Sequence, residues 1–164
     1  MLSRHSVSRI LAFIAPLVLA AACASHGNSG TRMPSAPADL VALNSAINQQ
    51  GRFCARDYCL EDWPEATELD TLAEWDCKAY AVAKAARLLS TGYAPTRLEY
   101  VLIDGPPLRV THAALLVDGR WVLDIGVRCQ VCELDQFRAG LRVSGRLPVT
   151  ELPYLRRALR AAGS

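Results

Sequence analysis

The stretch EWDCKAYAVAKAARLL, residues 74–89, decides the fold because it predicts an alanine-rich helix with a cysteine in its first turn. Asp76 is a residue type that favours the N-cap, so we expect a helix over 77–90 that stops before Gly92. The N-terminus of a helix offers unpaired amides and a positive dipole end, which favour a thiolate. Cys77 is therefore either a reactive thiol or, in the plainer interpretation, a small core residue.

Upstream of this helix the pattern predicts one more helix and an irregular segment. The stretch DLVALNSAINQQG, residues 39–51, has apolar residues at helical spacing and a glycine stop. Residues 52–75 contain two cysteines and no clear periodicity of apolar residues. We expect a short helix to begin at Pro64. The helical part of the domain therefore comes first along the chain.

Downstream the pattern changes to short apolar runs rich in β-formers. We expect three strands in an antiparallel meander, within RLEYVLI (97–103), VTHAALLV (110–117) and RWVLDIG (120–126). A short helix is expected within residues 133–141 and a terminal helix within residues 153–164. Helices followed by a small antiparallel sheet predict an α+β fold.

The register of the second hairpin decides whether two polar side chains meet. If the loop is 118–120, Leu115 faces Leu123 on one face of the sheet. The same register leaves His112 diagonal to Asp124 on the other face, within side-chain reach. A loop shorter by one residue would turn the two side chains onto opposite faces.

Cys77, His112 and Asp124 together match the requirements of nucleophilic catalysis. A thiolate attacks a carbonyl, an imidazole takes and returns the proton, and a carboxylate fixes the tautomer and orientation of the imidazole. The alternative is that all three are structural: a core thiol, a buried histidine and an acid at a strand end. The residues alone leave both interpretations open.

Three motifs resemble one known family. The segments WDCKAYAVAKAARLLSTGY (75–93), THAALLVDGRWVLDIG (111–126) and DWPE (62–65) resemble the bacterial transglutaminase-like cysteine peptidases, periplasmic relatives of the transglutaminase core in the papain-like group. The resemblance covers roughly residues 57–126. It implies a papain-like core in which a nucleophile helix packs on a small antiparallel sheet. It also implies a protein or peptide substrate, with Cys77 as nucleophile, His112 as base and Asp124 as orienting acid.

Some positions depart from the family pattern. Trp75, Lys78 and Ala79 stand where the family usually has Gly, Glu and Asp. Some members bind calcium through acids around the cysteine, and with these acids lost we expect no metal and no other cofactor. The oxyanion hole would use the backbone N–H of Cys77 and an indole N–H from Trp63 or Trp75, unless both tryptophans pack in the core. The departures also allow an alternative function, a catalytically silent lipoprotein that acts as an envelope binding module.

The N-terminal segment predicts export. Residues 1–22 have a basic start, an apolar run and small residues at the end, which is typical of a signal peptide. The sequence LAAAC resembles a lipobox, so we expect lipidation of Cys23, with ordinary cleavage at a neighbouring alanine as the alternative. Residues 23–38 would form an anchor and flexible tether, and residues 39–164 the peptidase domain, held at a periplasmic membrane.

Charge excludes one class of partner. The chain has 18 basic and 16 acidic residues, and loss of residues 1–22 removes two arginines and no acid. The mature chain therefore has no net charge, and no nucleic-acid partner is expected.

The remaining cysteines predict cross-links. Outside the cytoplasm, Cys54, Cys59, Cys129 and Cys132 favour two disulfides. The pairing is either local or crossed between the two segments, and we favour crossed pairing because a bridge over two intervening residues is often strained. The alternative is a four-cysteine zinc site, for which the C-x4-C and C-x2-C spacings are acceptable.

Overall fold

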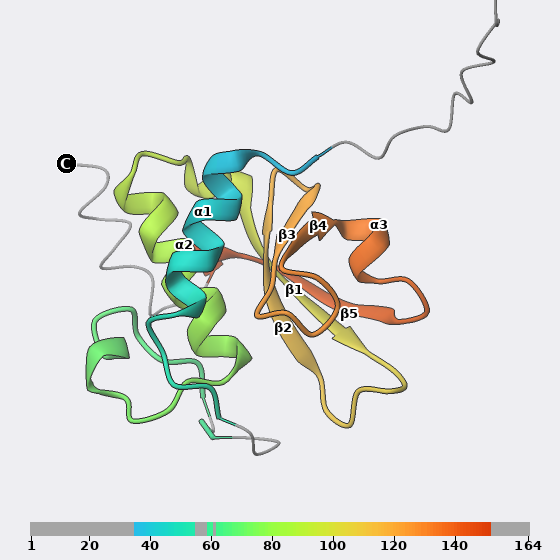
Figure 1. The fold of residues 1–164 in the computed structure, drawn as a ribbon, viewed down its shortest axis with the longest axis horizontal. Helices are drawn as coiled ribbons and strands as arrows, with labels where there is room; N and C mark the ends of the chain where they lie inside the picture. Colours follow the sequence, from blue (N-terminus) through green and yellow to red (C-terminus); the bar gives the residue numbers. More distant parts are fainter. Residues whose placement is uncertain (1–34, 55–58, 61, 152–164) are drawn as a thin grey trace, which may run out of the picture. The chain divides into compact units, whose positions relative to one another are not determined.

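Three helices, one of them short, and a five-stranded sheet make up the computed structural model, which describes residues 35–54, 59–60 and 62–151 (Figure 1). The helices are α1 (Ala38–Asn48), α2 (Cys77–Ser90) and the short α3 (Leu134–Phe137). The strands are β1 (Leu98–Asp104), β2 (His112–Val117), β3 (Trp121–Leu123), β4 (Val131–Glu133) and β5 (Arg142–Pro148). Single 3-10 turns occur at η1 (Leu69–Thr71), η2 (Pro95–Arg97) and η3 (Val149–Glu151). The α+β prediction is confirmed.

Some predictions lie outside the described residues. They are the signal peptide over 1–22, lipidation of Cys23, most of the tether, and the terminal helix within 153–164. Within the described part of the chain, no helix is long and apolar enough to cross a bilayer.

The sheet has the order β4-β3-β2-β1-β5, and every neighbouring pair is antiparallel. The predicted meander of β1, β2 and β3 is confirmed. Leu115 pairs with Leu123 and Val117 with Trp121, which is the register predicted for a loop over 118–120. The strands β4 and β5 were not predicted, because β4 has three residues and β5 is a largely polar edge strand.

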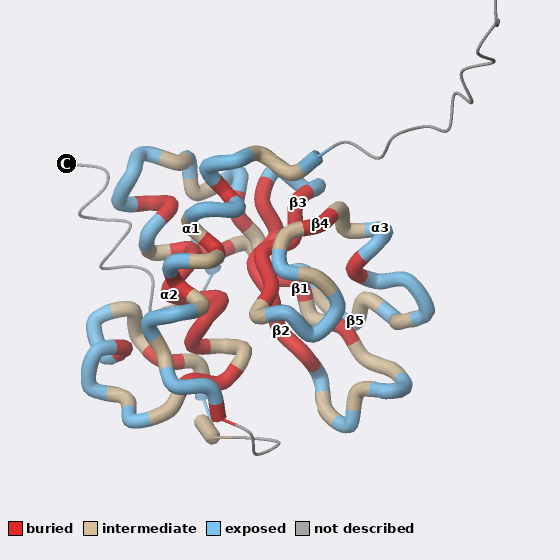
Figure 2. Tube along the Cα trace, in the orientation of Figure 1, coloured by how far each residue is buried: buried red, intermediate tan, exposed pale blue. Residues whose placement is uncertain are grey.

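Both faces of the sheet are covered, so β2 and β3 are buried along their whole length (Figure 2). On one face, Tyr100, Leu115 and Leu123 pack with α1 and α2. On the other face, Val101 and Leu116 pack with Phe137 of α3. Alternate side chains along each strand thus enter two separate apolar clusters, which fixes the register and with it the placement of polar residues at the strand ends.

The helix α2 begins where the sequence predicts. The carboxylate of Asp76 accepts hydrogen bonds from the backbone N–H groups of Lys78, at 3.0 Å, and Ala79, at 3.3 Å. This is the N-cap geometry that satisfies donors left unpaired at a helix start. Gly92, with φ of 94°, follows the helix end and adopts the left-handed conformation that glycine tolerates best. The cap therefore fixes Cys77 as the first residue of α2.

The cysteine pairing differs from the crossed arrangement that we favoured. The structure pairs Cys54 with Cys59 and Cys129 with Cys132, so both disulfides are local and the crossed prediction is wrong. A zinc site made of all four cysteines is likewise not formed. The cysteines of each pair are only 5 and 3 residues apart, so closing either loop costs little chain entropy. Cys77 is the free cysteine of the described residues.

Candidate active site

Three chain segments bring polar side chains to one cleft. Cys77 is the first residue of α2, His112 is the first residue of β2, and Asp124 follows directly after β3. Because α2 packs against β2, the helix start and the strand start lie close together, and Cys77 and His112 line the same cleft. The structure therefore brings together the three residues that the sequence selected.

The histidine is held by the acid. Nε2 of His112 lies 2.6 Å from Oδ1 of Asp124, and both side chains are almost completely buried. With Nε2–H donating to the carboxylate, Nδ1 is the ring nitrogen that remains for Cys77. The predicted diagonal placement of His112 and Asp124 is therefore what the structure contains.

The carboxylate of Asp124 is fixed from its other side by the backbone. Its Oδ2 accepts hydrogen bonds from the N–H groups of Gly126 (3.2 Å), Val127 (2.8 Å) and Arg128 (3.4 Å). Gly126 has φ of 109°, which lets the chain turn back around the carboxylate. One oxygen thus holds the loop and the other orients the imidazole.

The electrostatics favour an ion pair between these groups. Burial lowers the pKa of His112, but hydrogen bonds with Asp124 and Cys77 and the charges of both outweigh it and raise the pKa to about 9. Burial raises the pKa of Asp124, yet the hydrogen bond and charge of His112, with smaller contributions from a backbone N–H and Lys84, hold it below its ordinary range. At neutral pH the pair is an imidazolium and a carboxylate.

A buried lysine behind Asp124 was not identified from the sequence. Lys84 is 1% exposed, and its Nζ lies 3.5 Å from the carbonyl oxygen of Leu123. Burial lowers the pKa of Lys84 to about 7, although the charge of Asp124 acts in the opposite direction. The signal was present, because Lys84 interrupts the apolar face that Ala81 and Leu88 define on the predicted helix.

Two asparagines of α1 hold the segment around Asp124. Nδ2 of Asn48 donates to the carbonyl oxygen of Asp124 at 2.9 Å, and Nδ2 of Asn44 donates to that of Gln130 at 3.1 Å. The N–H of Asp124 donates to the same carbonyl of Gln130. No sequence signal pointed to this role, because it depends on how α1 packs beside β3 and β4. The arrangement ties the position of the acid to both long helices.

A second ion pair lies beside the nucleophile. Nζ of Lys78 lies 2.7 Å from Oδ2 of Asp76 and also donates to the carbonyl oxygen of Leu60 at 2.9 Å. Both charged side chains are largely buried. The ammonium group therefore neutralises Asp76 and links the start of α2 to the chain that follows Cys59.

Neither tryptophan matches the expectation that it donates to an oxyanion. Nε1 of Trp75 donates to the carbonyl oxygen of Leu69 at 3.0 Å, so this N–H is engaged within the core. Trp63 packs against the ring of Tyr100, with ring centroids 4.7 Å apart. Neither side chain lines the cleft, so the structure matches the alternative in which both pack in the core.

The cleft beside Cys77 has a volume of about 260 Å3. Phe53 and Cys54 form one wall, because residues 52–54 bridge to Trp75 immediately before α2. The chain between β1 and β2 forms the second wall, and residues 125 and 127 form the third. The thiol is half-buried within this space, which is open to solvent. The arrangement is suited to attack by a thiolate on a carbonyl carbon.

Comparisons with known proteins identify the fold. No family model and no curated protein matches the chain. Among solved structures, calcium-bound LapG of Legionella pneumophila has a TM-score of 0.57 and 16% identity, over 74% of this chain and 77% of that one. EGTA-treated LapG gives 0.56 and 16%, over 75% and 77%. A third LapG structure gives 0.57 and 16%, over 75% of each chain. The likeness shows the papain-like, transglutaminase-like fold.

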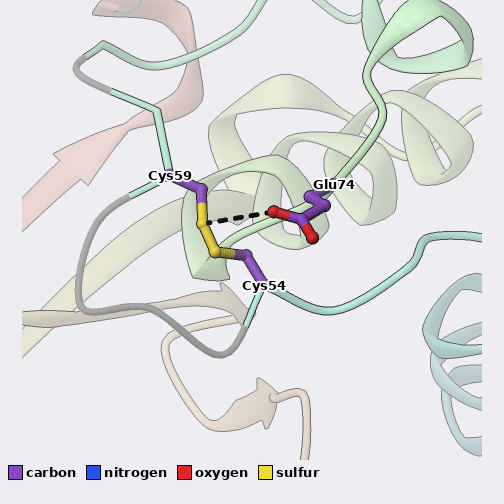
Figure 3. A group of neighbouring side chains, drawn as sticks. All are labelled: Cys54, Cys59 and Glu74. Carbon is purple, nitrogen blue, oxygen red and sulfur yellow. Dashed lines mark hydrogen bonds between the residues drawn. A yellow bond between two sulfur atoms is a disulfide. The ribbon is translucent and has the colours of Figure 1, made fainter.

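The described residues do not fit a calcium ion. Calcium takes six to eight oxygen ligands, usually with several carboxylates. Among the residues described, the one group of three potential ligand atoms is that of Cys54, Cys59 and Glu74 (Figure 3). Two of these atoms are disulfide sulfurs, and Oε2 of Glu74 lies 3.9 Å from the sulfur of Cys59. Asp76, the acid next to the thiol, already holds the ammonium group of Lys78.

Proposed function

We propose that this protein is a thiol hydrolase that cleaves a peptide or amide bond through an acyl-enzyme on Cys77. The observation that carries the proposal is that Cys77 and His112 share one cleft while Asp124 holds His112 at 2.6 Å. The transglutaminase-like fold supports it, and the resemblance of the sequence motifs to transglutaminase-like cysteine peptidases assigns the three roles to these residues. The substrate class is a protein or peptide.

Acylation needs a thiolate and a proton donor. Sγ of Cys77 attacks the carbonyl carbon and forms a tetrahedral intermediate. The imidazolium of His112 gives its proton to the leaving amine as the C–N bond breaks, which leaves a thioester on the sulfur. Asp124 stays ionised throughout and holds the ring in place. The pKa of His112 near 9 keeps this proton available at neutral pH.

Deacylation reverses the role of the histidine. Neutral His112 takes a proton from water as the water oxygen attacks the thioester carbonyl. The C–S bond then breaks, the carboxylic product leaves, and the thiolate and imidazolium are restored. Acyl transfer to an amine follows the same steps, with the amine in place of water.

The oxyanion of the intermediate needs a hydrogen-bond donor. The side chain of Asp76 caps the N–H groups of Lys78 and Ala79, and Cys77 N–H lies outside this cap at the positive end of α2. We assign the N–H of Cys77 as the donor. Loss of one such donor typically costs about 100- to 1,000-fold in rate.

Alkylation of the thiol tests the proposal. Without reductant, the other cysteines of the described residues are held in disulfides, so iodoacetamide reports on Cys77, and peptide mapping separates any label on Cys23. We expect selective modification of Cys77 at mildly acidic pH, and loss of that reactivity in His112→Ala. Slow modification that His112→Ala leaves unchanged would refute the proposal and favour the silent binding module.

We also propose that the chain is exported and lipid-anchored at Cys23. The basic start and apolar run of residues 1–22 support this, as do two disulfides, which persist in oxidising compartments. Metabolic labelling with an alkyne fatty acid should mark the full-length chain and not the variant Cys23→Ser. Equal labelling of both chains contradicts the assignment of Cys23.

A further inference from the structure

Apolar side chains form much of the lining of the cleft beside Cys77. Its side chains include Phe53, Pro107, Leu108, Val110, Ile125 and Val127. Among the described residues, three large apolar side chains are exposed, and two of them border this cleft, Phe53 at 55% and Val127 at 44%. Exposed apolar side chains that gather at a concave site indicate a surface that is covered when a ligand binds.

One charge in the lining is not balanced. Asp76 is paired with Lys78, and His112 is paired with Asp124. Arg109 belongs to the cleft wall formed by the chain that connects β1 and β2. Its side chain is exposed and forms no ion pair with any of the described residues. The guanidinium group is therefore a free positive charge at the edge of an apolar cleft.

Elsewhere in the described part of the chain, most exposed arginines contact a carboxylate. Arg97 binds Asp118, and Arg142 binds Asp104 at 2.8 Å. Arg109, which lines the cleft, has no such carboxylate partner among the described residues. A guanidinium pairs with a carboxylate through two parallel hydrogen bonds, so a ligand carboxylate is the group that would complete this site.

We propose that the cleft selects polypeptides that carry an apolar side chain beside the scissile bond and a carboxylate that pairs with Arg109. The inference rests on the proposed function and names its substrate class. The apolar side chain packs against Phe53 and Val127, which removes apolar surface from water. The carboxylate then lies beside the guanidinium group at the rim of the cleft.

The carboxylate has two possible sources, an acidic side chain or the free C-terminus of a peptide. Both present the same pair of oxygens to Arg109, and matched peptides separate them. An acidic side chain acts in a peptide with an amidated C-terminus. A terminal carboxylate loses its effect when it is amidated.

The test uses fluorescein-labelled octapeptide libraries that contain Ala, Val, Leu and Phe at random. One residue is fixed as Glu, Gln or Lys and is moved through each position in turn, with a free or an amidated C-terminus. Cleavage is measured for the full-length chain and for Arg109→Glu. The matched control is Arg87→Glu, which changes an exposed arginine in the last turn of α2, outside the cleft.

We expect the wild-type chain to prefer Glu over Lys at one position, or a free over an amidated terminus, by about tenfold in kcat/KM. Arg109→Glu should abolish or reverse the preference, added salt should weaken it, and Arg87→Glu should leave it unchanged. Cleavage without a charge preference, or a preference that survives Arg109→Glu, overturns the inference and leaves the proposed function intact.

Binding separates this inference from turnover. Fluorescence anisotropy of the same libraries with Cys77→Ala measures recognition without cleavage. One outcome is that Cys77→Ala binds the Glu libraries more tightly than the Lys libraries, with a preference that Arg109→Glu abolishes, while the wild-type chain cleaves neither. That result supports the proposed ligand class and contradicts the proposed hydrolase activity. Binding of Cys77→Ala that is the same for Glu and Lys libraries overturns the inference whatever the activity.

Discussion

Replacement of the buried lysine should stabilise the protein. Lys84 is 1% exposed, and burial lowers its pKa from 10.5 to about 7 against the opposing effect of the Asp124 charge. Each pH unit between those two values corresponds to about 1.4 kcal/mol, so the charged form costs the folded state about 5 kcal/mol. Lys84→Met keeps the length of the side chain and removes this cost.

Part of the gain is offset by lost contacts. Nζ of Lys84 lies 3.5 Å from the carbonyl oxygen of Leu123, a long hydrogen bond worth about 1 kcal/mol or less. We therefore expect Lys84→Met to raise the free energy of unfolding by about 3–4 kcal/mol at about pH 6. Urea unfolding followed by circular dichroism measures the difference.

The difference in stability between the wild type and Lys84→Met should depend on pH. A lysine whose pKa is lowered on folding has lost its proton in the folded state above about pH 7, while the unfolded chain keeps it up to about 10.5. Wild-type stability therefore rises with pH in this window by about 1.4 kcal/mol per pH unit relative to Lys84→Met. The advantage of the variant should shrink by about 3 kcal/mol between about pH 7 and 9.

The other lysine at the start of the same helix is the control. Lys78 pairs with Asp76 at 2.7 Å, so Lys78→Met leaves a buried carboxylate without its ammonium partner and should destabilise the protein. The reasoning is refuted if Lys84→Met is no more stable than the wild type at about pH 6, or if its advantage is the same at about pH 9.

Three further variants or conditions test the structure around the nucleophile. Asp76→Ala removes both the cap of α2 and the partner of Lys78, and it should lower the free energy of unfolding in urea by about 2–3 kcal/mol. Asp76→Asn keeps an oxygen that can accept the capping hydrogen bonds and should lower it clearly less. Equal losses for the two variants would contradict the capping role. Excess EGTA or millimolar calcium should leave the thermal midpoint of the wild type unchanged, and a clear shift with calcium would show that a site was missed. Gly51→Ala should destabilise the protein by about 1–3 kcal/mol, because the new Cβ would lie 2.4 Å from Cδ2 of Trp75. If the variant unfolds at the same urea concentration as the wild type, the indole ring of Trp75 moves aside without cost.

The parts of the site that the sequence could predict are those governed by local patterns. Asp76 marks the helix start by its capping chemistry, and this placed Cys77. The alternation of apolar residues around the turn at 118–120 fixed the pairing of β2 with β3, and this placed His112 and Asp124 within reach of each other.

Other features depend on contacts between distant segments. The role of Lys84 appears only when α2 covers β3, and β5 becomes a strand only because the edge of β1 is available to pair with it. Cysteine spacing does not determine connectivity, and the crossed pairing that we favoured between the two cysteine segments was wrong. The sequence left the role of Trp75 open, because an indole N–H looks the same in sequence whether it faces a cleft or a core carbonyl.

The central claim is that one imidazole lies between a carboxylate and a thiol, and the titration of that ring tests it most directly. Side-chain NMR of isotope-labelled histidine assigns His112 by the signal that is missing in His112→Ala. We predict a pKa of about 9 in the wild type and a lower pKa in Cys77→Ala, because the hydrogen bond and charge of Cys77 both raise it. An ordinary pKa near 6.5 for His112 that Cys77→Ala leaves unchanged would contradict the account.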